Sequence, residues 1–215
     1  MIRNVIFDLD GTLSDPRAGI EGGLRLAFSQ YGIEVEDPEV FREFIGPTLR
    51  DHLPRVYPGL GDEKYDAVVR AYRAYYSEKG KFENNPYPGI DELLRSLRAA
   101  GLRLAVATLK PRMFAKEILG HFGLAEYFDC IAGLELHYVS SDKRELILEC
   151  IKTLGALPEE TVMVGDREYD ILGAHSAGIK CIAVLYGYGA PGEMDAADWV
   201  VPSVEGLLEL LGGAR

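Results

Sequence analysis

Two aspartates lie two residues apart near the start of the chain, at the end of an apolar run. Residues 2–9 predict a buried strand, which is closed by Asp8 and Asp10 before the turn-forming residues Gly11 and Thr12. Because side chains alternate between the two faces of a strand, the two carboxylates point the same way. Crowded carboxylates repel each other, so we expect this pair to bind a cation or to have separated pKa values.

The chain beyond residue 90 predicts helices and strands in regular alternation. Short apolar runs predict the strands, and the segments between them have helical spacing. This alternation predicts an α/β fold in which a doubly wound parallel sheet forms a Rossmann-like core with helices on both faces. The strands predicted after the first are residues 102–108, 130–133, 161–166, 180–185 and 199–201.

Residues 15–84 differ in character from the rest of the chain. Apolar residues recur there at helical spacing, glycine and proline interrupt them, and no segment is typical of a strand. We therefore predict a helical insert after the first strand, with residues 14–17 and 84–88 as its two hinge segments. The predicted domains are an α/β catalytic core domain at 1–14 and 85–215 and a small helical cap domain at 15–84.

Two adjacent glycines, Gly22 and Gly23, fall inside the first helix predicted for the cap. Glycine lowers helix propensity, so its presence in a helix needs a reason. Either the pair eases movement of the cap, or it allows another element to pack closely. The sequence leaves both explanations open.

Residues that can bind a metal or a phosphate follow several of the predicted strands and one predicted helix start. Because the carboxyl ends of parallel strands share one edge of a sheet, residues far apart in the chain can meet there. Carboxylates suit Mg²⁺, a hard cation that takes oxygen ligands, whereas lysine and hydroxyl groups suit phosphate oxygens. The residues concerned are Asp8, Asp10, Thr108, Lys143, Asp166 and Asp170.

This set resembles the motifs of the haloacid-dehalogenase-like hydrolase superfamily. Residues 8–12 match its first motif, DxDGT, and Thr108 matches the second, a serine or threonine at a strand end. Lys143 matches the third motif, and residues 165–170 match the fourth, a Gly-Asp pair followed by another aspartate. Residues 46–51 resemble the cap loop of phosphoglycolate phosphatases and their near relatives.

The resemblance implies roles for the acids. Asp8 would attack phosphorus as the nucleophile and form an aspartyl-phosphate. Asp10 would protonate the leaving oxygen and then deprotonate the attacking water. Mg²⁺ would be held by Asp8, the backbone carbonyl of Asp10 and Asp166, with Asp170 as a further ligand or an orienting group.

The resemblance also implies how the substrate is bound. Lys143 and Thr108, with backbone N–H groups such as that of Leu109, would surround the transferring oxygens. Arg50 in the cap could act as a fork for a carboxylate or a second phosphate. It could equally be a solvated residue near a helix start, and the sequence does not separate these two roles.

The function implied is a Mg²⁺-dependent phosphatase that hydrolyses a small phosphomonoester, with phosphoglycolate as the first expectation. A 5′-nucleotidase or a sugar-phosphate phosphatase on the same machinery is the second. A phosphomutase follows, and then a non-catalytic regulatory protein of the same fold. A dehalogenase does not need the second acid, so Asp10 argues against it.

Composition limits the partners and the compartment. The 215 residues are 47% hydrophobic and have a formal net charge of −11, so nucleic acids and anionic membranes are poor partners. A small phosphorylated metabolite can still bind where a metal and a few cations reverse the local field. No apolar run reaches the ~20 residues that span a bilayer, and the N-terminal apolar stretch is too short and too acidic for a signal peptide. We expect a cytoplasmic monomer or homodimer.

Residues 187–192 match the pattern G-x-G-x-x-G of dinucleotide sites. Pro191 and the short tail that follows leave no room for the βαβ unit which such a site needs. We therefore reject these residues as the fingerprint of a dinucleotide cofactor. Superfamily members that this chain resembles have a similar loop here, near the rim of the active site.

Overall fold

The computed structural model describes residues 1–136 and 142–213. The strands of its main sheet are β1 (Asn4–Phe7), β4 (Arg103–Pro111), β5 (Cys130–Leu134), β6 (Thr161–Gly165), β7 (Lys180–Val184) and β8 (Trp199–Val201). Their order in space is β5-β4-β1-β6-β7-β8, and every neighbouring pair is parallel. The first strand of the chain therefore lies inside the sheet, between β4 and β6.

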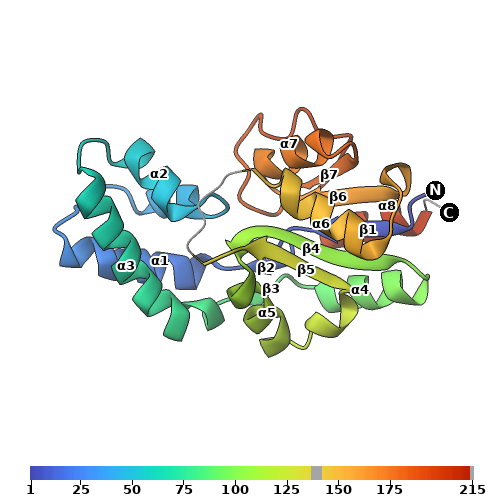
Figure 1. The fold of residues 1–215 in the computed structure, drawn as a ribbon, viewed down its shortest axis with the longest axis horizontal. Coiled ribbons are helices and arrows are strands. Elements are labelled where there is room, and N and C mark those ends of the chain that lie inside the picture. The colour runs from blue at the N-terminus through green and yellow to red at the C-terminus, as the bar shows by residue number, and fades with distance from the viewer. Residues whose placement is uncertain (137–141, 214–215) are drawn as a thin grey trace.

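Helices cover both faces of this sheet (Figure 1). One face is covered by α4 (Ile90–Ala99), α5 (Arg112–His121) and α8 (Val204–Gly213). The other face is covered by α6 (Arg144–Leu154) and α7 (Glu168–Ser176). Two short 3₁₀ turns, η3 (Ala125–Tyr127) and η4 (Pro158–Glu160), lie in the connections. Within β1, Val5 and Phe7 pack into one core cluster and Ile6 into the other, as strand alternation requires. The predicted α/β fold with a doubly wound parallel sheet is confirmed.

Two strands have boundaries that differ from the prediction by more than one residue. The first ends at Phe7 rather than residue 9, because the chain turns there and the backbone N–H of Leu13 bonds to the carbonyl of Leu9 at 2.9 Å. Strand β4 continues to Pro111 rather than ending at Thr108, because pairing with β5 resumes after an irregularity between these two residues. That extension holds the segment after Thr108 beside the sheet.

The insert after β1 is helical, as predicted. It contains α1 (Arg17–Gln30), η1 (Pro38–Phe44), α2 (Leu49–Val56), α3 (Asp62–Glu78) and η2 (Gly80–Phe82). Figure 1 shows α1, α2 and α3 beside the sheet rather than over either face. The insert has its own apolar core, which includes Phe28, Phe41 and Val68 and also takes in Phe114 from α5.

The chain leaves and re-enters the core through two short strands. Strand β2 (Ser14–Asp15) pairs antiparallel with β3 (Asn85–Pro86), so the two predicted hinge segments lie side by side. We keep residues 15–84 as the proposed cap and residues 1–14 with 85–215 as the proposed core. Among the described residues, no helix is both long enough and apolar enough to cross a membrane.

The glycines of α1 allow other elements to approach the helix closely. A Cβ atom on Gly23 would lie 2.9 Å from a ring carbon of Tyr72, and one on Gly22 would lie 3.0 Å from the hydroxyl of Tyr75. Both tyrosines belong to α3, which packs against α1. The structure thus favours close packing as the reason for this glycine pair.

We expect Gly19→Ala to destabilise the protein. A Cβ atom at this position would lie 1.8 Å from the backbone carbonyl oxygen of Gly80, so α1 must move away from η2. Overpacking of this kind costs about 1–3 kcal/mol. The free energy of unfolding, measured with a chemical denaturant, should fall by that amount.

Gly120→Ala is the matched control. Gly120 is exposed within α5, and a Cβ atom there would have no neighbour within 4 Å. Alanine favours a helix over glycine by about 0.5–1 kcal/mol, so this variant should be as stable as the parent or slightly more stable. Equal stability of Gly19→Ala and the parent would contradict the close approach.

Candidate active site

Strand register brings the predicted functional residues to one edge of the sheet. Phe7, the last residue of β1, has Val106 in β4 and Val164 in β6 as its neighbours. The chain continues from each of these three residues in the same direction, so the polar groups one or two residues further on lie at the same edge of the sheet. They are Asp8, Thr108 and Asp166, which are all buried.

Three carboxylates form a buried cluster at this edge. One oxygen each of Asp8, Asp166 and Asp170 lies within 4.8 Å of the others, and all three residues are buried. The ammonium of Lys143, which is 2% exposed, lies 2.6 Å from Oδ2 of Asp8 and 2.5 Å from Oδ1 of Asp170. One cation therefore faces three acids.

The pKa values of the cluster reflect this imbalance. Burial raises the pKa of Asp166, and the nearby charges of Asp170 and Asp8 raise it further. Burial also raises the pKa of Asp170, against the opposing effect of Lys143. Burial alone would lower the pKa of Lys143, but Asp170 and Asp8 raise it above its ordinary value. The cluster thus lacks positive charge.

Neighbouring groups hold the carboxylates in place. Asp166 accepts hydrogen bonds from the hydroxyl of Thr12 at 3.2 Å and from the backbone N–H of Tyr188 at 2.7 Å. Asp170 accepts one from the backbone N–H of Arg167 at 2.9 Å. Buried oxygen donors with fixed orientations and excess negative charge fit Mg²⁺, as the sequence predicts.

The glycine-rich loop at residues 187–192 covers this cluster. A Cβ atom on Gly187 would lie 2.4 Å from the Cβ of Asp166, and one on Gly189 would lie 2.3 Å from its backbone oxygen. Only glycine allows so close an approach without a shift. The loop therefore packs onto the Asp166 region.

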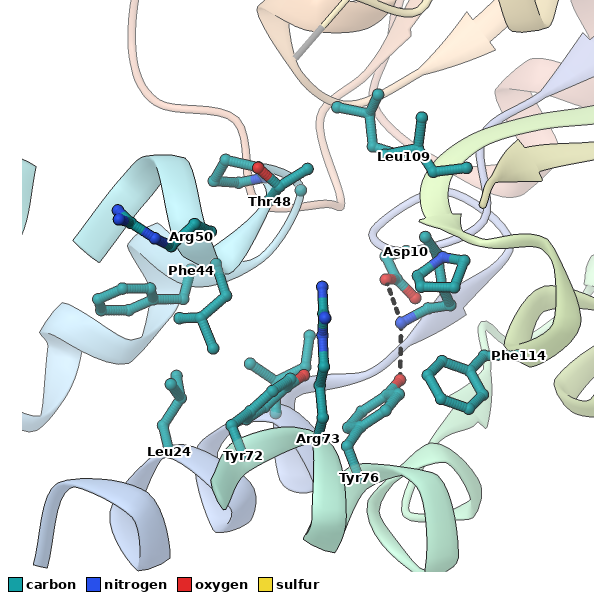
Figure 2. A pocket seen from close by; sticks show the side chains of 17 residues that line it. Asp10, Leu24, Phe44, Thr48, Arg50, Tyr72, Arg73, Tyr76, Leu109 and Phe114 are labelled. Carbon is teal, nitrogen blue, oxygen red and sulfur yellow. Dashed lines mark hydrogen bonds and ion pairs between the residues drawn. The ribbon is translucent and has the colours of Figure 1, made fainter. Parts of the chain in front are cut away.

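Asp10 lies in a different environment from the cluster. Its Oδ2 atom is 2.7 Å from the ammonium of Lys110, which also donates to the hydroxyl of Tyr76 at 2.6 Å (Figure 2). Its Oδ1 atom is buried and has no hydrogen-bond partner among the described residues. Burial raises the pKa of Asp10, and Lys110 partly opposes that effect. The metal contact predicted for Asp10 is through its backbone carbonyl and stays a prediction.

Lys110 and Tyr76 are site residues that the motifs of the sequence do not predict. Lys110 follows Thr108 by two residues, and its backbone N–H donates to the Thr108 hydroxyl at 3.3 Å. Its place just beyond a strand-end hydroxyl was the available signal. Tyr76 had no local signal, because it reaches the site from α3 through tertiary packing.

A cavity lies between the insert and the core, on the Asp10 side of the site (Figure 2). Leu109 and Arg50, both predicted to bind substrate, line it. The guanidinium of Arg50, however, forms ion pairs of 2.6 Å with both Asp62 and Asp66. Its substrate contact stays a prediction. The other lining residues include Ile20, Leu24, Phe44, Thr48, Tyr72, Arg73, Tyr76, Lys110 and Phe114.

Comparison with known proteins identifies the family. The model of the haloacid dehalogenase-like hydrolase family matches residues 5–184, which include every acid described above. The chain belongs to this family. The resemblance predicted from the motifs is thereby confirmed.

Its relatives within this family have different names. A 5′-nucleotidase of Pseudomonas aeruginosa is 40% identical over 193 residues, which are 90% of this chain and 87% of that protein. A phosphoglycolate phosphatase of Aquifex aeolicus is 33% identical over 187 residues, 87% of this chain and 86% of that one. The crystal structure of a predicted phosphatase from Clostridium acetobutylicum superposes with a TM-score of 0.92 at 38% identity and covers 99% of both chains.

We expect Lys110→Met to destabilise the protein through the loss of a buried ion pair. Removing one partner of such a pair leaves a buried charge uncompensated and costs about 3–5 kcal/mol. Unfolding by denaturant should show this loss, and adding Asp10→Asn to Lys110→Met should recover part of it. Lys116→Met is the control, because Lys116 is exposed on α5. Additive effects in the double variant would contradict the pairing.

We expect millimolar Mg²⁺ to raise the melting temperature of the protein relative to NaCl of equal ionic strength. A ligand that binds only the folded state stabilises it, and this cation also relieves the repulsion among Asp8, Asp166 and Asp170. The gain should shrink in Asp166→Asn and persist in Asp195→Asn, which changes an exposed aspartate. A gain of equal size in both variants would rule out the cluster as the binding site.

Proposed function

We propose that this haloacid dehalogenase-like hydrolase is a Mg²⁺-dependent phosphatase that hydrolyses a small phosphomonoester through an aspartyl-phosphate on Asp8, with phosphoglycolate as the substrate. The observation that carries the proposal is the division of the site into two halves. Asp8 lies with Lys143 and the acidic cluster, whereas Asp10 borders the cavity. The first half suits a phosphoryl group, and the second suits the leaving group.

On the phosphoryl side, the Asp8 carboxylate is 3% exposed and lies 2.6 Å from the ammonium of Lys143, so it is placed to act as the nucleophile. One of its oxygens accepts a hydrogen bond from the backbone N–H of Leu9 at 2.7 Å, which orients the group. Lys143 is placed to attract phosphoryl oxygens as well as to hold Asp8. Mg²⁺, held by Asp8, Asp166 and Asp170, would offset the repulsion between the nucleophile and its anionic substrate.

On the leaving-group side, Asp10 supplies the proton. As the bond from Asp8 to phosphorus forms, the ester bond breaks and its oxygen takes a proton from Asp10. Water then attacks the aspartyl-phosphate and gives its proton to Asp10, which releases phosphate, frees the Asp8 carboxylate and returns Asp10 to its protonated form. A raised pKa favours the protonated form that the first step needs, and Oδ1 of Asp10 has no competing partner among the described residues.

A 5′-nucleotide is the second candidate substrate. Aromatic side chains of Phe44, Tyr72 and Phe114 line the cavity and offer surfaces on which a base could pack. The relative from Pseudomonas aeruginosa named 5′-nucleotidase points the same way. The ratio of kcat/KM for phosphoglycolate to that for a 5′-nucleoside monophosphate separates the two candidates.

The purified protein should hydrolyse p-nitrophenyl phosphate with Mg²⁺ and lose this activity with a chelator. Asp8→Asn should remove turnover, because the amide is a poor nucleophile. Asp10→Asn should lower kcat by about 10²–10⁴-fold while the circular-dichroism spectrum remains that of a folded protein. Hydrolysis that Asp8→Asn leaves unchanged would exclude the mechanism, and a collapsed spectrum for Asp10→Asn would indicate a structural role instead.

A further inference from the structure

Two arginines of the insert line the cavity, and their surroundings differ. Arg50 on α2 lies between Asp62 and Asp66, both at 2.6 Å, and its guanidinium is 5.4 Å from the ring centre of Tyr65. In Figure 2 its guanidinium points away from Asp10. These contacts satisfy the charge of Arg50 within the insert.

Arg73 on α3 is placed in the opposite way. Figure 2 shows its side chain rising between Tyr72 and Tyr76 into the space that separates Thr48 from Asp10. It is partly buried, and it makes no hydrogen bond or ion pair with any residue in the ranges 1–136 and 142–213. Its guanidinium therefore keeps its donors for whatever enters the cavity.

The positive charge of Arg73 has no negatively charged side chain beside it among the described residues that line the cavity. The ammonium of Lys110 is already engaged, by Asp10 at 2.7 Å and by the hydroxyl of Tyr76 at 2.6 Å. The walls around Arg73 include the apolar side chains of Ile20, Leu24 and Phe44. Electrostatic attraction is stronger beside such walls than in open water. Among the described residues that line the cavity, Arg73 is thus the cation that lacks an anionic partner.

We propose that Arg73 binds an anionic group on the leaving-group side of the substrate, a carboxylate or a second phosphate. The proposal rests on the phosphatase function, because the cavity receives a leaving group only if Asp8 receives the phosphoryl group. A guanidinium can bind either anion with two parallel hydrogen bonds, which adds geometric selection to the charge. Arg73 is then the specificity-determining residue of this cavity, and the enzyme prefers esters whose alcohol carries an anion.

Matched substrate pairs test this preference. Phosphoglycolate is compared with ethyl phosphate, and 3-phosphoglycerate with glycerol 3-phosphate, because each pair differs in a carboxylate. The parent enzyme should cleave at least one acid with a higher kcat/KM than its neutral partner. Arg73→Gln should lower kcat/KM for that acid by about 10- to 100-fold, the usual effect of a charge-assisted hydrogen bond, and leave the neutral ester within about threefold. Arg73→Lys should retain part of the preference, because it keeps the charge and loses the fork.

Arg70→Gln is the matched control, since Arg70 is an exposed arginine one turn earlier on the same helix. It should leave both rates unchanged. The preference is overturned if the parent favours neither acid, if Arg73→Gln leaves the ratio intact, or if it lowers both rates of a pair equally. Hydrolysis of p-nitrophenyl phosphate by the same preparations distinguishes these results from failure of the phosphatase itself, which would show as no Mg²⁺-dependent turnover.

Discussion

The repulsion among Asp8, Asp166 and Asp170 is the constraint on which the site depends. Three buried carboxylates with ligand oxygens within 4.8 Å of one another are stable only if positive charge is close by. Lys143 provides part of it through contacts with two of the three. Lys143 directly precedes α6, and this position lets its ammonium reach both Asp8 and Asp170. The negative charge that Lys143 does not neutralise is the reason why we expect the cluster to bind a divalent cation.

The same site also ties the insert to the core. Lys110 joins Asp10 to Tyr76 of α3, so a group proposed for proton transfer is linked directly to the insert. On the other side, the guanidinium of Arg167 donates to the backbone carbonyl of Ile45. Arg167 lies between Asp166 and Asp170 in sequence, so the segment that carries these two acids contacts the insert there. Both links hold the insert against the core at the edge of the sheet where the acids lie.

The residues proposed to carry out the reaction and those proposed to select the substrate lie in different parts of the chain. The sheet edge carries the charges that we propose act on a phosphoryl group, and these lie within the residues that the family model matches. The cavity beside Asp10 takes its walls mainly from the insert, where Arg73 and the aromatic residues Phe44 and Tyr72 lie. Relatives named for different substrates are compatible with this arrangement, because the walls can change without disturbing the cluster.

Sequence alone determined the sheet, the helical insert and the acids, because these depend on local rules. Asp8 and Asp166 each come directly after or within one residue of the end of a parallel strand, so register brings both to the same edge whatever the details of packing. The tertiary structure decided the partners. Lys110 meets Tyr76 across 34 residues of chain, and no spacing rule links positions so far apart. It likewise decided which cap arginine is engaged by acids and which points into the cavity, because that choice depends on how α2 and α3 pack rather than on either sequence segment.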